Sequence, residues 1–311
     1  MTSYIIRKIL NLIPVLLGVS LIIFLLFNVV AGDPTAILLG KNATARQMAD
    51  LREQLGLNKP LFDQYLDVVK SAFTLDFGYS WATKQEILEM IKRGAYPSLC
   101  LSIPAFIIST ILSLIVSLFV AYYRGKGIDY VVRFVCIAGM SISALAYILF
   151  FQWFFAYKLG WFEISGFEFG FPNFVPYIAL PAIIWIILSL GPDVRFFRTV
   201  ILDEIYQDYV RTARSKGLSE ITILLKHVLR NALIPIITYV VIQIPSLILG
   251  ALLLENFFSI PGLGGMTLNA LNSSDFPVMK AMAILSSIVY ILFSLISDIL
   301  YTVADPRIKM K

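Results

Sequence analysis

Six long apolar segments dominate the chain and restrict the folds that are open to it. They occupy residues 9–31, 97–123, 132–156, 174–192, 232–254 and 279–303. A helix needs about 20 apolar residues to cross the hydrocarbon core of a bilayer, and each segment approaches or exceeds that length. Only 14% of the residues are charged, whereas a soluble domain has about a quarter. The sequence therefore predicts an all-α integral membrane protein with six transmembrane helices.

Lysine and arginine in the loops predict the orientation of the chain. Basic residues precede the first segment, follow the second and the sixth, and fill the stretch between the fourth and the fifth, whereas loops 157–173 and 255–278 share just Lys158. Because cytoplasmic loops are enriched in Lys and Arg, we expect both termini to be cytoplasmic. Segment 32–96 has eight Lys and Arg but also eight Asp and Glu, and loops of its length cross the membrane regardless of charge.

These expectations divide the chain into four parts. They are an N-terminal transmembrane helix (1–31), an extracytoplasmic amphipathic segment (32–96), a core of five transmembrane helices (97–304) and a cytoplasmic tail (305–311). The first apolar run is too long for a cleaved signal peptide. In the external segment, Thr44 and Gln47 have the spacing of a helix N-cap and its N3 partner. Pro60 should end that helix, and residues 61–73 predict another.

The polar stretch 193–231 lies between the fourth and fifth apolar segments and predicts a lever at the membrane surface. Residues 195–209 carry an apolar stripe with few helix breakers, and Gly217 then interrupts the pattern. Ser219 suits the N-cap of a second helix, and Glu220 suits its positive end. A helix, a glycine corner and a helix can move as one body when another protein binds them.

Several motifs follow one another along almost the whole chain. They are Leu55-Gly56-Leu57 with Pro60, Asp76-Phe77-Gly78-x-Ser80, Tyr209-Val210-Arg211-Thr212-Ala213-Arg214-Ser215-Lys216-Gly217-Leu218 followed by Ile234-Pro235, Glu255-x-x-Phe258-x-Ile260-Pro261-Gly262-Leu263-Gly264, and Asp305-Pro306-Arg307. Together they resemble the permeases of the oligopeptide, dipeptide and nickel branch of ABC importers, of the dipeptide permease B type. The Arg-Thr-Ala string at 211–213 stands where the general family has Glu-Ala-Ala, which is typical of this branch.

The resemblance implies a type I importer transmembrane fold in a bacterial inner membrane. It also implies a set of partners: a second homologous permease, two cytoplasmic ATPases and an extracytoplasmic solute-binding protein. The chain lacks the Gly-x-x-x-x-Gly-Lys-Ser/Thr string that cradles phosphates, so ATP and Mg²⁺ belong to the partner ATPases, and we expect no enzyme activity or cofactor in this chain. The net charge of +5 reflects topology, and no nucleic-acid partner is expected.

Three groups of residues are candidates for function. By resemblance, the ATPase-coupling residues are Asp208, Tyr209, Arg211, Thr212, Ala213, Arg214, Lys216, Gly217 and Leu218. The external gate or binding-protein contact comprises Glu255, Phe258, Ile260, Pro261, Gly262, Leu263 and Gly264. Polar residues are costly in lipid and often functional. The candidates for the translocation path are therefore Gln152, Tyr239, Gln243, Ser294 and Asp298.

The expected cargo is a dipeptide, an oligopeptide or a solute of similar size, and a nickel or other metal chelate is the alternative within the same family. Other interpretations remain open. The basic stretch also fits a surface helix held against anionic lipid headgroups, the glycines at 262–265 fit an ordinary re-entrant turn, and Asp298 fits pairing with a neighbouring helix. A secondary transporter working alone usually has ion-coupling carboxylates or internal repeats, and an intramembrane hydrolase needs a Ser-His or two-Asp pair at membrane depth.

Overall fold

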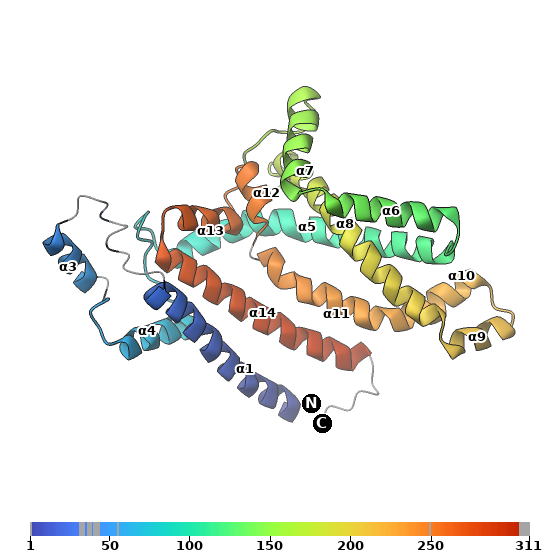
Figure 1. The fold of residues 1–311 in the computed structure, drawn as a ribbon, viewed down its shortest axis with the longest axis horizontal. Helices are drawn as coiled ribbons and strands as arrows, with labels where there is room; N and C mark the ends of the chain where they lie inside the picture. The colour runs from blue at the N-terminus through green and yellow to red at the C-terminus, as the bar shows by residue number, and fades with distance from the viewer. Residues whose placement is uncertain are drawn as a thin grey trace.

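The computed structural model describes residues 2–30, 44–54, 56–248 and 250–304, together with Thr35 and Leu39. This part of the chain is a helical bundle (Figure 1). Five of its helical stretches are long and apolar enough to cross a membrane, and a bent pair of helices makes a sixth. The long helices are α1 (Thr2–Phe24) with η1 (Leu25–Val30), α5 (Ile87–Tyr122), α8 (Val175–Ile205), α11 (Leu229–Ile248) and α14 (Phe276–Ala304). The predicted cytoplasmic tail, 305–311, lies outside the described residues.

The sequence predicts that the third apolar segment is one straight helix, but the structure shows two helices that meet at a bend. It consists of α6 (Gly127–Ser141) and α7 (Ala144–Phe151) with η2 (Gln152–Lys158), and the two halves meet at 91°. The bend lies at Ile142, whose backbone is extended. The hydroxyl of Ser141 donates to the carbonyl of Ile137. In Figure 1, α7 projects from the bundle while α6 packs along α8.

Two further helices have different limits from those predicted. Helix α5 begins at Ile87, ten residues before the predicted span, and so extends into the segment expected to be external. Helix α8 runs on to Ile205 instead of ending at 192. At about 1.5 Å per residue its 31 residues span about 46 Å, which exceeds the roughly 30 Å hydrocarbon core. Its last two or three turns therefore extend beyond that core.

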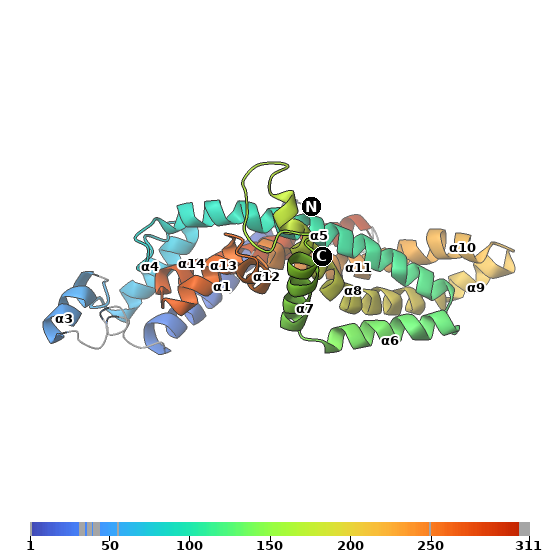
Figure 2. The same ribbon diagram turned by 90° about the horizontal axis from the view of Figure 1, so that it is seen from above.

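The external segment packs on the bundle through α4 (Leu61–Thr74), whereas α3 (Ala45–Gln54) lies at the far end of the molecule (Figure 2). The predicted capping at the start of α3 is confirmed, because the backbone N–H of Gln47 donates to Thr44 Oγ1 and that of Thr44 donates to Gln47 Oε1. The Tyr65 hydroxyl donates to the carbonyl of Leu17 at 3.0 Å. Val68 and Ala72 are buried against α1 and α14.

Between α11 and α14 the chain makes two short helices, α12 (Leu252–Phe257) and α13 (Leu263–Asn272). They lie beside the first half of α5 and the start of α14 (Figure 1). At the other end of the molecule, α9 (Asp208–Ser215) and α10 (Glu220–Thr222) join α8 to α11 through a π-helical turn, η3 (Ile223–Val228). Figure 2 shows α9 and α10 at the end opposite to α3.

Candidate functional site

The elbow, residues 208–222, has one face packed on the bundle and one face open. Val210 and Ala213 are buried in a cluster formed with α8 and α11, whose members include Phe197, Ile201, Ile205, Ile223, Val228 and Ala232. The opposite face is polar and exposed, and comprises Asp208, Arg211, Thr212, Ser215, Lys216 and Leu218. The elbow is thus anchored to two long helices and presents a polar surface outward.

Gly217 allows the chain to turn at this corner. Its φ is +75°, in the left-handed region. Its N–H donates to the carbonyl of Arg214 at 2.9 Å, and the N–H of Leu218 donates to that of Ala213 at 3.4 Å. These two bonds make the Schellman motif that commonly ends a helix with glycine. A β-carbon at 217 would meet no other atom within 4 Å, so the backbone conformation requires this glycine and crowding within the chain does not.

Two polar contacts fix the geometry of the elbow. The guanidinium of Arg214 donates to both oxygens of Glu220, at 2.7 and 3.1 Å, and so bridges the glycine corner. This hydrogen bond raises the pKa of Arg214. The hydroxyl of Tyr209 donates to Glu204 at 2.6 Å. Burial, reinforced by that hydrogen bond, raises the pKa of Tyr209 to about 12, so the phenol is neutral at physiological pH.

Some sequence-based expectations for the elbow need correction. Residues 195–209 are not one helix, because α8 ends at Ile205 and α9 begins at Asp208. Ala213, which the resemblance places among the ATPase-coupling residues, is buried in this chain's own core. Arg214 pairs with Glu220 instead of presenting a free charge to a partner. The N-cap at Ser219 is confirmed, since its hydroxyl accepts from the N–H of Thr222.

The gate segment, residues 250–265, is organised around one buried carboxylate. Glu255 is 0% exposed. Its Oε1 accepts from the Ser98 hydroxyl at 2.7 Å and from the N–H of Ala251 at 3.1 Å, and its Oε2 accepts from the N–H of Gly265 at 3.0 Å. Ser98 Oγ in turn accepts from the N–H of Leu263 at 2.8 Å. One side chain therefore connects α5, α12 and the start of α13.

The glycines of this segment are closely packed, which contradicts the expectation that they are flexible. Gly264 and Gly265 lie in the first turn of α13. A β-carbon at 264 would lie 2.7 Å from the backbone of Leu252, and one at 262 would collide with Glu255 and Ser98. These two positions are small because backbone and carboxylate approach them.

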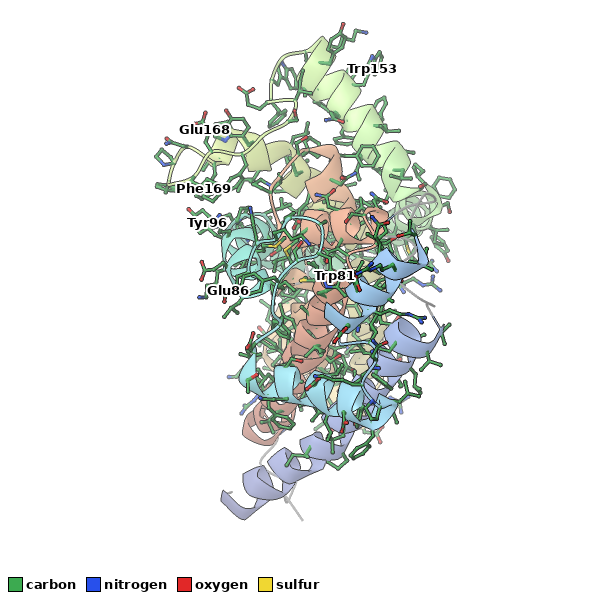
Figure 3. All side chains as sticks on the ribbon, turned by 90° about the vertical axis from the view of Figure 1, so that its left-hand side faces the viewer. Trp81, Glu86, Tyr96, Trp153, Glu168 and Phe169 are labelled. Carbon is green, nitrogen blue, oxygen red and sulfur yellow. The ribbon has the colours of Figure 1, made fainter. Side chains whose placement is uncertain are left out.

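Most gate residues are inaccessible to a partner in this conformation. Glu255, Phe258, Ile260, Gly262, Leu263 and Gly264 are all buried, and Pro261 is the exposed member of the predicted set. The surface beside the gate segment is aromatic. Figure 3 shows Tyr96 near Phe169 of the loop 157–173, and their rings stack at 6.0 Å. Glu168 of that loop accepts from the Tyr177 hydroxyl at 3.0 Å.

The path candidates are scattered through the bundle. Gln152 donates to the carbonyls of Ile164 and Phe257 and so joins the external loop to α12. Gln243 is half-buried on α11, and Ser294 is exposed on α14. Asp298 lies in α14, but its side chain is outside the described part of the structure. Among the described side chains, Gln243 contacts Asp193 and Tyr239, but it does not meet Gln152 or Ser294.

Tyr239 contacts a buried carboxylate, Asp193, that the sequence analysis did not select as a candidate. Its hydroxyl donates to Asp193 at 3.0 Å, and its ring stacks on Phe196 at 4.2 Å. Asp193 is buried within α8. The predicted fourth span ends at residue 192, which places Asp193 in the polar stretch that follows, but α8 continues through it to Ile205.

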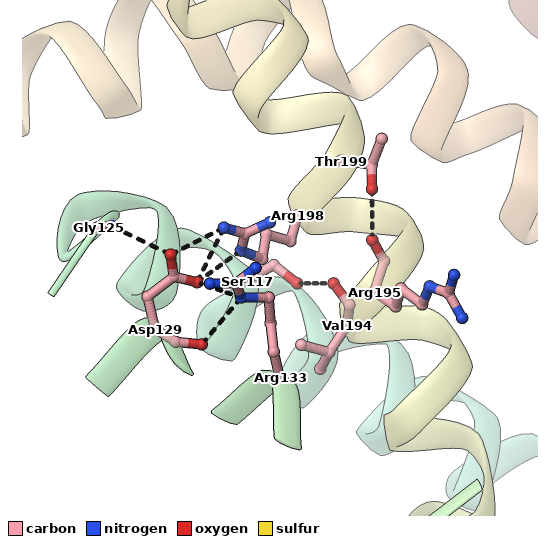
Figure 4. Close-up of polar contacts among 8 residues, drawn as sticks. All are labelled: Ser117, Gly125, Asp129, Arg133, Val194, Arg195, Arg198 and Thr199. Atoms are coloured by element: carbon pink, nitrogen blue, oxygen red, sulfur yellow. Dashed lines mark hydrogen bonds and ion pairs between the residues drawn. The ribbon is translucent and has the colours of Figure 1, made fainter. Parts of the chain in front are cut away.

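Two more buried carboxylates, Asp275 and Asp129, hydrogen-bond to distant parts of the chain, and neither was predicted from the sequence. Asp275 accepts from the Ser80 hydroxyl and from the N–H groups of Trp81 and Ala82, so it attaches the external segment to the start of α14. At the other end of the bundle, Asp129 accepts from Arg198 Nε and Nη2, both at 2.9 Å (Figure 4).

Comparison with known proteins agrees with the sequence motifs. A family model described as "Binding-protein-dependent transport system inner membrane component" matches residues 113–310, and the model for the N-terminal part of such components matches residues 1–103. The glutathione transport system permease proteins GsiC of Shigella flexneri, Escherichia coli and Salmonella typhi are each 32% identical to this chain over 311 residues, which is 100% of both proteins. The chain therefore belongs to the inner-membrane permeases of binding-protein-dependent ABC importers, which are translocation components and not enzymes.

Proposed function

We propose that this permease forms half of the translocation pathway for small peptides. The full-length similarity to glutathione permeases supports a peptide-like cargo, because glutathione is itself a short peptide. A second homologous permease would complete the pathway, two cytoplasmic ATPases would supply energy, and an extracytoplasmic binding protein would deliver the cargo. Both termini would then be cytoplasmic, as the distribution of Lys and Arg predicts.

The exposed face of the elbow is the proposed ATPase contact. It carries Arg211, whose side chain is 78% exposed and lies 3.7 Å from the carboxylate of Asp208. The buried face of the elbow is part of the same core as α8 and α11. A displacement of the elbow by closing ATPases would therefore move both helices, since closely packed interiors transmit strain. This arrangement is the observation that carries the proposal.

The gate segment is proposed to respond at the opposite end. Glu255 holds α12 and α13 against α5 through three hydrogen bonds, so a movement of α5 would carry the turn at Pro261 with it. The binding protein would meet that turn together with the second external loop, residues 157–173. Asp193 and Tyr239 join α8 to α11 between the two ends, and we place them beside the path. Alternating access would then be a shift of population between two packings of these helices.

The experiment uses a Gly217→Trp substitution in the importer reconstituted with its ATPases and binding protein. Because the space around this corner is open in the chain itself, the indole would project into the proposed ATPase contact and not into the bundle. We expect peptide uptake to fall at least tenfold, while ATPase activity persists. Gly78→Trp is the matched control, because Gly78 also has a positive φ and open space but lies outside the elbow and outside the surfaces proposed to meet the binding protein. Normal uptake by Gly217→Trp would refute the proposed contact.

A further inference from the structure

A groove between α6 and α8 combines cationic and apolar walls. It encloses about 260 Å³ and is lined by Val132, Arg133, Cys136, Ile137, Val194, Arg195, Arg198 and Thr199. Three of these residues are arginines, and four have apolar side chains or a thiol. The volume lies just below the roughly 300 Å³ at which pockets for drug-sized ligands begin. It suits a small charged group with an apolar attachment.

The groove has an excess of positive charge. Asp129 is the carboxylate that faces these arginines, with a side chain only 3% exposed. It pairs with Arg198 at 2.8 Å and with Arg133 at 3.3 Å, and it also accepts from the N–H of Gly125 at 3.1 Å. Arg195 is exposed and forms no ion pair with any residue that the structure describes. Three guanidinium groups against one carboxylate leave a net charge of about +2.

The position of these arginines relative to the membrane indicates which class of ligand the groove can bind. Arg195 and Arg198 lie 20 and 23 residues after the start of α8 at Val175, and about 20 residues cross the hydrocarbon core. Their guanidinium groups therefore reach the level of the lipid headgroups. Beside them α6 exposes Phe134, Ile137 and Met140, which are apolar and 45% to 72% exposed. An acyl chain can lie along this face while the phosphate sits among the arginines.

We propose that this groove binds the phosphodiester headgroup of an anionic phospholipid. Arginine is suited to the task because its planar guanidinium binds phosphate oxygens in pairs, and basic pockets between transmembrane helices bind anionic headgroups. The phosphate would be held chiefly by Arg195 of α8, whose guanidinium extends away from the Asp129–Arg198–Arg133 cluster (Figure 4), and the bound lipid would lie between α8 and α6. The helix that leads into the elbow would thereby be linked to α6 by a lipid.

The test measures lipid binding to the purified full-length chain in neutral detergent by native mass spectrometry. Phosphatidylglycerol should bind at least fivefold more tightly than phosphatidylcholine of the same chain length. Arg195→Gln should weaken phosphatidylglycerol binding about fivefold, and Arg195→Lys should weaken it less because it retains the charge. Arg230→Gln removes another exposed arginine outside the groove and should bind as the unaltered chain does. Folding is monitored by thermal unfolding, and no ion pair among the described residues is lost at position 195.

Each other result overturns the proposal. Equal binding of the two lipids, or unchanged binding in Arg195→Gln, would show that the groove is not a binding site for anionic phospholipid. Equal affinity for inorganic phosphate or glycerol 3-phosphate would assign the groove to a soluble phosphate compound. Loss of the lipid on assembly with the second permease would make the groove a subunit interface. Because no transport is measured, the result is independent of whether the proposed cargo and ATPase contact are right.

Discussion

The elbow and the gate segment both depend on glycine, but for different physical reasons. Gly217 lies in open space and has a positive φ, so its backbone conformation requires glycine. Gly264 has an ordinary helical backbone, but a β-carbon at this position would lie 2.7 Å from the backbone of Leu252. The first is a corner on the surface and the second is a close contact around a buried carboxylate. A glycine in a motif therefore does not by itself indicate flexibility or a partner's contact.

The elbow and the gate segment also differ in how much their polar contacts contribute to stability. The polar contacts of the elbow are largely exposed, as in the Arg214–Glu220 pair, whereas the carboxylate of Glu255 is 0% exposed. Exposed ion pairs contribute little to stability, while buried polar groups are costly once a partner is lost. Substitutions at the gate segment should therefore change folding, and those at the elbow should mainly change coupling. The predictions below test that contrast.

The largest effect is expected for Glu255→Leu. The substitution leaves the Ser98 hydroxyl and the N–H groups of Ala251 and Gly265 without their acceptor. Each buried donor without an acceptor costs about 1–3 kcal/mol, so we expect a loss of about 3 kcal/mol or more in unfolding free energy, measured by thermal or denaturant unfolding in detergent. Glu163→Leu, at an exposed glutamate of the loop 157–173, is the control. Equal stability of the two variants would contradict the central role of Glu255.

The next effect compares two adjacent glycines. Gly264→Ala places a methyl group 2.7 Å from the backbone of Leu252, which cannot rotate away, whereas at Gly265 the nearest atom is 3.5 Å distant. Overpacking of this kind costs about 1–3 kcal/mol. We expect Gly264→Ala to lower the unfolding temperature and to reduce the stimulation of ATPase activity by the loaded binding protein. Gly265→Ala should match the unaltered protein in both measurements, and a similar loss in both variants would show that crowding is not the cause.

Much of the helical architecture could be predicted, because apolar length and capping residues act locally. The capping at Thr44 and Ser219 and the helix after Pro60 depend on neighbours within a few residues. The ends of α5 and α8 could not, because prolines and charged residues inside a helix are tolerated when tertiary contacts compensate for them. Asp193 is an example, since Tyr239 of α11 provides its hydrogen bond.

The candidate sites were predictable as motifs but not as geometry. The motif around Gly217 located the elbow, yet the direction in which Arg214 points depends on Glu220 across the corner. The motif around Glu255 located the gate segment, but its burial depends on Ser98, which is 157 residues away in the sequence. The bend at Ile142 has no proline to indicate it, and Gly139, whose carbonyl accepts the N–H of Ile142, was not used in the sequence analysis. Contacts between distant segments decided these features.

A smaller effect is expected at the corner of the elbow. Gly217→Ala forces an alanine into the left-handed conformation at φ +75°, which costs about 1 kcal/mol. Asparagine tolerates that conformation better, so Gly217→Asn should recover most of the stability measured by thermal unfolding. If crowding instead controlled this position, the larger asparagine would be the worse of the two. The order of the two variants thus distinguishes conformation from crowding at the elbow.

The smallest effect is expected for the ion pair that bridges this corner. The side chains of Arg214 and Glu220 are 34% and 50% exposed, and exposed pairs contribute about 0.2–1 kcal/mol. Arg214→Gln, Glu220→Gln and the double variant form a cycle from which the interaction free energy follows, with chemical denaturation as the measurement. We expect a coupling below about 1 kcal/mol, decreasing as salt is added because exposed charges are screened. A coupling of several kcal/mol that is insensitive to salt would mean that the elbow resists deformation as strongly as the gate segment does, and the contrast between the two ends would fail.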